Sequence, residues 1–233
     1  MYSNRAGGTE QIDEMEATPA FARASYRAME GVNRHLGGTR VVRQFIEREL
    51  RDFDQDRPLR ALDLGSGACD IPIAIARWAR EHGYGVEFTC LEPNPHGRAM
   101  ARAKLREHPY LPVEVREDRF EEYSPDTPYD CAVGSMFFHH FTDRQILDML
   151  RRLRGFVRRS VLINDLHRTP VAFLGFMVLS FAAARAVTRD GLHSIRRGFR
   201  LSALKSTLEQ VPDAEVRIRW AYLFRVAAEV RFA

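Results

Sequence analysis

Hydrophobic residues in the first part of the chain recur at the spacing of an amphipathic helix. Between residues 20 and 53, apolar side chains fall on one stripe at intervals of three and four residues. The stripe is interrupted once, at Gly37 and Gly38, and two adjacent glycines are a signal that a helix breaks. The pattern therefore predicts two helices, followed by a linker at residues 54–58. Residues 1–55 are expected to form a helical extension that covers the rest of the protein as a lid.

Beyond the linker, short apolar runs alternate with amphipathic ones. Short strands that alternate with helices are typical of a parallel sheet covered by helices on both faces. Two strand-like runs follow each other within residues 214–233, which predicts a hairpin and an antiparallel strand at the C-terminus. The expected fold is α/β, with a doubly wound, mainly parallel sheet of seven strands. The other five strands are expected at residues 60–64, 85–92, 111–118, 129–136 and 160–165, and the helices at 70–82, 95–107, 142–156 and 201–210.

The most apolar segment, residues 170–187, needs a separate interpretation. Its uncharged part ends before Arg185, after about 15 residues, whereas a membrane-spanning helix needs about 20. Stable membrane insertion is therefore not expected. Three alternatives stay open: a core helix, a helix that lines or covers an apolar substrate pocket, and a shallow membrane contact. Residues 188–200 are expected to form a loop, within an apolar helical insertion that spans residues 166–210.

Composition and charge narrow the class of protein. A length of 233 residues fits one domain with additions, and the 45% of hydrophobic residues is typical of a soluble globular protein. The net charge of +4 comes from arginine and forms no dense basic run, so a nucleic-acid partner is not indicated. Cys69, Cys90 and Cys131 are odd in number and lie in or beside apolar runs, which predicts reduced, buried thiols. The sequence begins without an apolar signal segment, so a cytoplasmic location is expected.

Glycines and carboxylates gather where the first strands are expected to end. The stretch LDLGSGACDIP at residues 62–72 places Gly65 and Gly67 after a strand, where the lack of a side chain lets the backbone approach a ligand. Glu92 follows the next strand, and a carboxylate there accepts hydrogen bonds from the two hydroxyls of a ribose. Asp118, after the third strand, is placed to accept from an exocyclic amine. Because open parallel sheets bind ligands where their strands end, the pattern predicts a cofactor that contains adenosine.

Two further carboxylates decide between classes of cofactor. Asp63 precedes the glycine loop, and Asp70 follows it at the expected start of a helix. A dinucleotide would place its pyrophosphate at that helix N-terminus, where two carboxylates would repel it. The same carboxylates suit a ligand that carries an ammonium and a sulfonium group, so the cofactor expected is S-adenosylmethionine. A nucleotide-dependent dehydrogenase is the alternative enzyme.

The stretches LDLGSGACDIP, CLEPNP, REDRFEEY and YDCAVGSMFFHHFTD resemble the successive motifs of class I S-adenosylmethionine-dependent methyltransferases. The resemblance covers residues 59–165 and the C-terminal strand pair, and it implies a Rossmann-like methyltransferase domain over residues 56–233. The helical extension and the HHF.D pattern are similar to small-molecule methyltransferases, including those that act on quinones and phenols. Cys69 and Asp70 depart from the pattern, because many relatives have a third small residue or glycine there. The resemblance implies that the cofactor is bound by Asp63, Gly65, Ser66 and Gly67 around the methionine part, Glu92 and Pro93 at the ribose, Asp118 with Arg119 or Phe120 at the adenine, and Gly134, Ser135 and Met136 beside the methyl group.

His139 and His140 follow the fourth strand, beside the expected position of that methyl group. Histidine is the side chain best suited to take a proton near neutral pH, so both are candidates for catalysis, and His140 is preferred. In the alternative interpretation the pair only begins the next helix and packs or caps there. Arg196 and Arg197 are expected to face solvent or an anion. Substrate contacts at the pocket rim are expected from Asn164 with its neighbour Asp165, from His167, Arg168 and His193, and no spacing indicates a metal site.

These features predict in-line methyl transfer to oxygen or carbon of a small, aromatic or apolar hydroxylated metabolite. The helices within residues 26–50 and the segment 173–181 are expected to enclose a dry chamber around it. An RNA or protein methyltransferase, or a protein that binds the cofactor without catalysis, are the alternatives that stay open. The motif of base-amino methylases, Asn or Asp before two prolines and an aromatic residue, is replaced here by GSMF. The sequence leaves the oligomeric state open.

Overall fold

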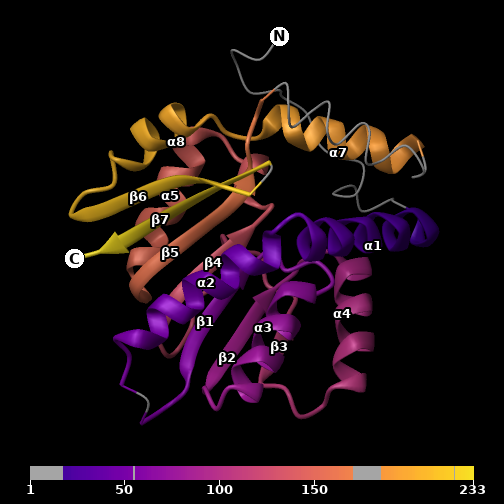
Figure 1. Cartoon of the computed structure of the whole chain (residues 1–233), viewed down its shortest axis with the longest axis horizontal. Helices are drawn as coiled ribbons and strands as arrows, with labels where there is room; N and C mark the ends of the chain where they lie inside the picture. The colour runs from indigo at the N-terminus through magenta and orange to yellow at the C-terminus, as the bar shows by residue number, and fades with distance from the viewer. Residues whose placement is uncertain (1–17, 55, 170–184, 223) are drawn as a thin grey trace.

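The computed structural model of the protein describes residues 18–54, 56–169, 185–222 and 224–233 (Figure 1). The chain begins with two helices, α1 (Pro19–His35) and α2 (Gly38–Arg51), which meet where the sequence predicted a break. Gly37 lies between them with a φ of +83°, and a Cβ there would come within 2.5 Å of the Tyr222 ring. Glycine is therefore needed at this corner for both backbone conformation and space.

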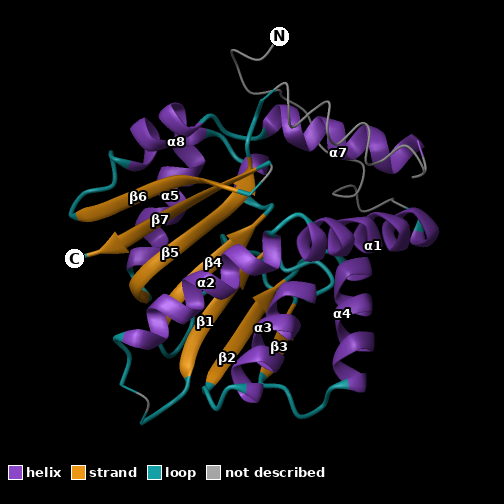
Figure 2. Cartoon of the chain, viewed as in Figure 1, coloured by secondary structure: helices purple, strands orange, loops and turns teal. Residues whose placement is uncertain are grey.

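Seven strands form one sheet in the order β3-β2-β1-β4-β5-β7-β6 (Figure 2). Neighbouring strands among the first five are parallel, whereas β7 is antiparallel to both β5 and β6. This arrangement confirms the predicted fold, including the antiparallel strand at the C-terminus. The strands are β1 (Leu59–Leu64), β2 (Val86–Leu91), β3 (Val113–Arg116), β4 (Tyr129–Ser135), β5 (Val157–Leu166), β6 (Ala214–Ala221) and β7 (Arg225–Phe232). The remaining helices are α3 (Asp70–Glu81), α4 (Pro95–Glu107), the 3-10 turn η2 (Phe138–His140), α5 (Asp143–Arg154), α7 (Arg185–Arg197) and α8 (Leu201–Leu208).

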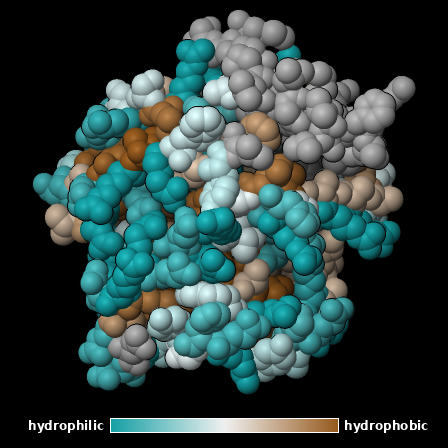
Figure 3. Space-filling view, in the orientation of Figure 1, coloured by the Kyte–Doolittle hydropathy of each residue, from teal (hydrophilic) through white to brown (hydrophobic). Residues whose placement is uncertain are grey.

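Helices cover both faces of the sheet because alternate residues of each strand point to opposite sides. Ala61 of β1 belongs to the core formed with α2 and α3, and Leu62 belongs to the core formed with α5 and α8. In α2, Phe45 and Ile46 are fully buried, so this helix is a packed layer of the fold. On the face drawn in Figure 3, most of the described surface is hydrophilic and hydrophobic side chains show only in patches between polar ones.

The expectation of a loop over residues 188–200 is wrong. Helix α7 runs from Arg185 to Arg197 and therefore contains Gly191. Glycine inside a helix costs only about 1 kcal/mol relative to alanine, and packing outweighs this cost when the helix buries side chains such as Ile195. Most of the apolar segment 170–187 lies outside the described residues. None of the described helices has the length and apolarity to cross a membrane.

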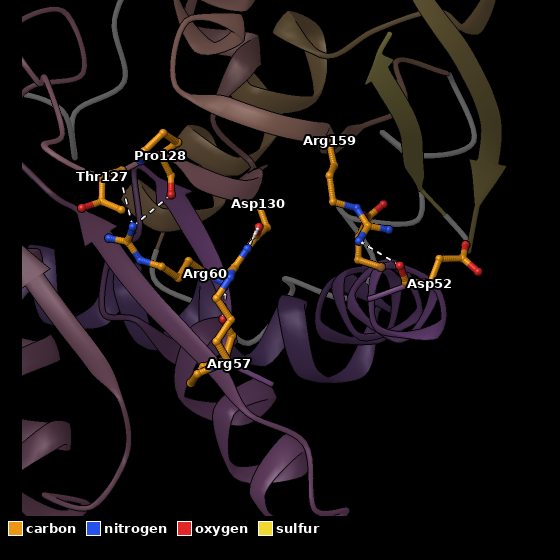
Figure 4. A network of polar contacts seen from close by, with 9 residues as sticks. Asp52, Arg57, Arg60, Thr127, Pro128, Asp130 and Arg159 are labelled. Atoms are coloured by element: carbon orange, nitrogen blue, oxygen red, sulfur yellow. Dashed lines mark hydrogen bonds and ion pairs between the residues drawn. The ribbon is translucent and has the colours of Figure 1, made fainter. Parts of the chain in front are cut away.

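A buried carboxylate network lies at the edge of the sheet where β1 and β4 begin (Figure 4). Both oxygens of Asp130 accept from the Arg57 guanidinium at 2.7 Å, and one of them also accepts from the backbone N–H of Arg60 at 2.8 Å. The Arg60 side chain in turn donates to the carbonyls of Thr127 and Pro128. Burial alone would raise the pKa of Asp130, but these donors outweigh it and hold the pKa below the ordinary value.

Candidate active site

A cavity of about 310 Å³ opens at the opposite edge of the sheet, where β1, β2 and β4 end. Its walls come from α1, from the loops after β1 and β2, from Arg119 beyond β3, and from the segment that follows β4. Figure 1 shows α1 lying across the ends of α3 and α4 at this edge. The cavity therefore occupies the position where open parallel sheets bind their ligands.

The glycine loop after β1 forms the floor of the cavity. Gly65 has a φ of +63°, and a Cβ there would lie 2.4 Å from the Phe137 ring. Gly67 has a φ of +54°, and a Cβ there would lie 3.1 Å from the Tyr26 ring. Cys69 also takes up a left-handed conformation (φ 54°), which glycine adopts most easily, and its side chain is buried. Cys69 stands where many methyltransferases have glycine or another small residue, and its backbone keeps the conformation that glycine would adopt.

Glu92 is bound to the glycine loop from the side of β2. The backbone N–H of Gly67 donates to its Oε2 at 2.6 Å, and that of Asn94 donates to its Oε1 at 2.8 Å. Glu92 is 5% exposed and lines the cavity. Since a carboxylate has about four lone-pair sites, these bonds orient it and leave capacity to accept from a ligand.

Asp63 and Asp70 bring one buried and one half-buried carboxylate to the same wall. Burial raises the pKa of Asp63 to about 7, and the nearby charges of Asp70 and Glu92 add to the shift. Burial also raises the pKa of Asp70, which accepts a hydrogen bond of 3.0 Å from the Nδ2 of Asn33 on α1. A carboxylate with a pKa near 7 is poised to ionise when a cationic group binds beside it.

His139 and Asp165 form a buried pair on the other side of the cavity. The Nδ1 of His139 lies 2.7 Å from the Oδ1 of Asp165, and the His139 backbone N–H donates to the second oxygen at 3.1 Å. Burial alone would raise the pKa of Asp165, but the His139 ring, the Leu166 N–H and His140 hold that pKa below its ordinary value. Asp165 is therefore an ionised acceptor, so the proton of neutral His139 lies on Nδ1 and Nε2 is the basic nitrogen.

The structure distinguishes the two histidines that the sequence left together. Both line the cavity, and their ring centroids are 4.2 Å apart, but the bond to Asp165 belongs to His139. His140 was the preferred candidate from the sequence. A sequence does not reveal which of two adjacent histidine rings a distant carboxylate contacts. Arg197 of α7 was expected to face solvent or an anion, which is wrong. It is 7% exposed and donates to the backbone carbonyls of His139 and His140, at 3.2 and 2.7 Å.

Aromatic side chains form the apolar wall beside the histidines. Phe137 and Phe141 line the cavity with ring centroids 4.9 Å apart, and Phe138 lies fully buried behind them. Gly134 leaves room for this packing, since a Cβ there would lie 2.4 Å from the Phe138 ring. The wall suits a flat, apolar ligand.

Most of the residues predicted to bind the cofactor line this cavity. Asp118, Phe120 and Gly134 are not among the described residues that do so. Asp118 lies 2.9 Å from the Nε of Arg116, and Phe120 is packed in the core. The predicted residues that line the cavity are Asp63, Gly65, Ser66, Gly67, Glu92, Pro93, Arg119, Ser135 and Met136.

The residues predicted to contact substrate, Asp165 included, are not among the described residues that line the cavity. Asn164 is fully buried and its Nδ2 donates to the Ser135 hydroxyl at 2.9 Å. His167 is half-buried near Trp220, and burial lowers its pKa. Arg168 is buried, and its backbone N–H donates to a carbonyl beyond α7. His193 lies on α7.

The sequence-based prediction missed specific cavity residues contributed by distant elements. Helix α1 supplies Tyr26, Met29 and Asn33, for which the pattern had predicted only a general covering role. Phe137 and Phe141 lie in the same motif as the two histidines and also line the cavity, which was not predicted. Among the described residues, no group of three or more His, Cys, Asp or Glu side chains is placed to hold a metal ion.

Comparison with known proteins agrees with this geometry. Residues 61–160 match the family model of a methyltransferase domain. Over these residues, which are less than half of the chain, the protein is similar to a methyltransferase domain. The match includes the glycine loop, Glu92 and the histidine pair, and it confirms the prediction of a methyltransferase. No curated protein sequence matches the chain.

Solved methyltransferase structures share the fold over nearly the whole chain. The plantazolicin methyltransferase BamL, solved with a triazolic desmethylPZN analog and SAH, has a TM-score of 0.72 at 13% identity, with 95% of this chain and 94% of that chain covered. Magnesium protoporphyrin IX methyltransferase (ChlM) from Synechocystis PCC 6803, with bound SAM, has a TM-score of 0.64 at 11% identity, with 98% and 100% covered. The mitomycin 7-O-methyltransferase MmcR has a TM-score of 0.64 at 20% identity, with 97% of this chain and 62% of that chain covered. At these identities the likeness concerns the fold.

Proposed function

We propose that the protein transfers a methyl group from S-adenosylmethionine to a small, aromatic or apolar hydroxylated acceptor. The observation that carries the proposal is the placement of the His139–Asp165 pair in the same cavity as the glycine loop and Glu92. One side of the cavity thus offers a cradle for a nucleoside, and the other offers a base against an aromatic wall.

The residues of the cradle fit S-adenosylmethionine. Glu92 would accept from the ribose hydroxyls, Asp63 would face the ammonium group, and Gly65 and Gly67 place backbone where side chains would intrude. Two of the similar structures are described with SAM or SAH bound. When bound, this cofactor supplies a methyl group on a sulfonium, which is already a strong electrophile.

His139 supplies the proton transfer in the proposed reaction. Its Nε2 would accept the hydroxyl proton of the acceptor as the acceptor oxygen takes the methyl group that the bound cofactor would supply. Asp165 holds the ring and stabilises the positive charge that His139 acquires. Arg197 keeps the histidine segment in place through its two carbonyls.

The acceptor class follows from the wall that faces His139. Phe137 and Phe141 offer apolar ring surface, which favours a flat aromatic or apolar acceptor. The three similar structures are named for methyl transfer involving plantazolicin, magnesium protoporphyrin IX and mitomycin, the last at an oxygen. We also propose that α1 serves as the lid, because Tyr26 and Met29 lie in the cavity wall.

Two measurements test the proposal in sequence. Calorimetric titration with S-adenosylhomocysteine should show binding, and titration with NADH should not. A panel of phenols and quinols incubated with methyl-labelled S-adenosylmethionine should then yield labelled methyl ethers or ring-methylated products. Binding without turnover on any member of the panel would favour a non-catalytic binding protein, and label found in added RNA would favour an RNA methyltransferase. Absence of S-adenosylhomocysteine binding would overturn the proposal.

A further inference from the structure

Arg225, the first residue of β7, is a buried cation beside the cavity. It is 1% exposed, and its Nη2 donates to the Oδ1 of Asn33 at 2.7 Å and lies 3.5 Å from the sulfur of Met136. Its Nε and Nη1 are also buried, and neither has a hydrogen-bond partner among the described residues. Asn33 and Met136 both line the cavity, so the guanidinium lies one side chain behind its wall.

A buried guanidinium with two unpartnered N–H groups is costly for the fold. Unpaired buried donors destabilise a folded protein, and the destabilisation is larger when the group is charged. Burial lowers the pKa of Arg225 to about 10, with the charges of Asp165 and Asp70 opposing the shift, so the side chain stays positive at neutral pH. Asp165 is already bonded to His139, and Asp70 to Asn33. Neither carboxylate is hydrogen-bonded to the guanidinium itself, so two of its nitrogens stay buried behind this wall without a hydrogen-bond partner among the described residues.

The position of this cation matches a need of the proposed cofactor. The methionine part of S-adenosylmethionine carries an ammonium and an α-carboxylate. The wall beside the glycine loop offers Asp63 and Asp70 to the ammonium, whereas Arg119 is the only Arg or Lys among the described lining residues and follows the adenine-side strand β3. Through Asn33, Arg225 is connected to Asp70 at the start of α3, directly after that loop.

We propose that Arg225, together with Asn33, provides the counter-charge for the α-carboxylate of the cofactor. The inference rests on the proposed function, since it assumes that S-adenosylmethionine binds in this cavity. A carboxylate on the methyl acceptor would be the other source of the same chemistry. That alternative predicts that affinity for the cofactor product does not depend on Arg225, so binding measurements without an acceptor separate the two.

The test compares two ligands that differ by one carboxylate. S-adenosylhomocysteine carries both the amine and the carboxylate, and S-adenosyl-3-thiopropylamine carries the amine alone. Calorimetry on the full chain should show that Arg225→Met raises the Kd for S-adenosylhomocysteine at least about tenfold, the equivalent of 1.4 kcal/mol, and leaves the Kd for the amine within about twofold. Arg225→Lys, which keeps the charge, should lose less. Arg217→Met on the exposed face of β6 is the matched control and should change neither Kd.

Three results would overturn the inference. The first is an unchanged Kd for S-adenosylhomocysteine in Arg225→Met, which would assign the cation to the acceptor or to the fold. The second is an equal loss for both ligands, which would indicate a structural role. If Arg225→Met does not fold, Asn33→Ala takes its place in the same comparison, and equal Kd changes for the two ligands would be the third. Failure of the unchanged protein to bind S-adenosylhomocysteine would instead overturn the proposed function.

Discussion

Asp130 and Asp63 are buried aspartates on adjacent strands of one sheet, and they lie at opposite edges. Asp130, at the start of β4, is 2% exposed and accepts three hydrogen bonds from Arg57 and Arg60, so its pKa lies below the ordinary value. Asp63, near the end of β1, is 4% exposed, and burial raises its pKa to about 7. The same residue type is thus held charged at one edge and close to neutral at the other.

The difference indicates that buried charges stabilise the fold where β1 and β4 begin and are available to a ligand where these strands end. At the edge with Asp130, the charged groups satisfy one another inside the protein. At the cavity edge, Asp63 and Arg225 are buried with fewer hydrogen-bond and ion-pair partners. This lowers the stability of the fold unless a ligand supplies groups of opposite charge. Variants at the two edges should therefore affect different measurements.

The largest effect is expected for the proposed base. His139→Gln keeps a polar side chain but cannot take the proton, so kcat on a substrate from the phenol panel should fall by about 10²–10³-fold. The Kd for S-adenosylhomocysteine should stay close to that of the unchanged protein. His82→Gln, at an exposed position after α3, is the matched control. A kcat within threefold of the control would mean that His139 only packs.

A smaller effect is expected at the ribose end of the cavity. Glu92→Gln keeps the shape of the side chain but removes its charge and one acceptor oxygen. Because hydrogen bonds to charged groups are worth about 1.5–3 kcal/mol, the Kd for S-adenosylhomocysteine should rise by about 10–100-fold. Glu87→Gln, at an exposed position of β2, should leave this Kd unchanged. Calorimetry checks both, and equal behaviour of the two variants would refute the role of Glu92.

The smallest effect tests the two aspartates directly. At pH 8, Asp130→Asn should lower the free energy of unfolding by about 1–3 kcal/mol, because it breaks a satisfied network. Asp63→Asn should raise it by about 1 kcal/mol, because it removes a charge from a dry site.

The sign of the second change depends on pH. The pKa of Asp63 in the folded protein, about 7, lies above the ordinary value of 3.8 expected in the unfolded chain. The folded state therefore binds the proton more tightly, and the contribution of Asp63 to stability falls as the pH rises from about 4 to about 7. Urea denaturation should show a stabilising effect of Asp63→Asn at pH 8 and none near pH 4. If both variants lowered the free energy of unfolding at pH 8, the proposed difference between Asp130 and Asp63 would be refuted.

The sequence predicted most helices and strands, and it predicted the glycine loop and Glu92 of the cavity, since both depend on local patterns. The helix expected at residues 142–156 is α5, which begins with a capping box formed by Thr142 and Gln145. The order of strands and helices predicted the doubly wound sheet. Gly65, Gly67 and Glu92 were found because strand ends and turn glycines can be recognised from neighbouring residues alone.

Two pairings escaped prediction because the residues of each pair come from distant segments. His139 and Asp165 are 26 positions apart, and Asn33 and Arg225 are 192 apart. The sequence shows that these residues are present, but it does not show which of them form contacts in the folded protein.

The sequence by itself determined the class of fold and the glycine loop that lines the cavity, because periodicity and glycine chemistry act over a few residues. Only the tertiary structure decided that His139 carries the bond to Asp165, that Arg197 holds the histidine segment, and that Arg225 lies behind the cavity wall. The physical reason is that burial and pairing set the charge of a side chain. Both depend on which distant segments the fold packs around it.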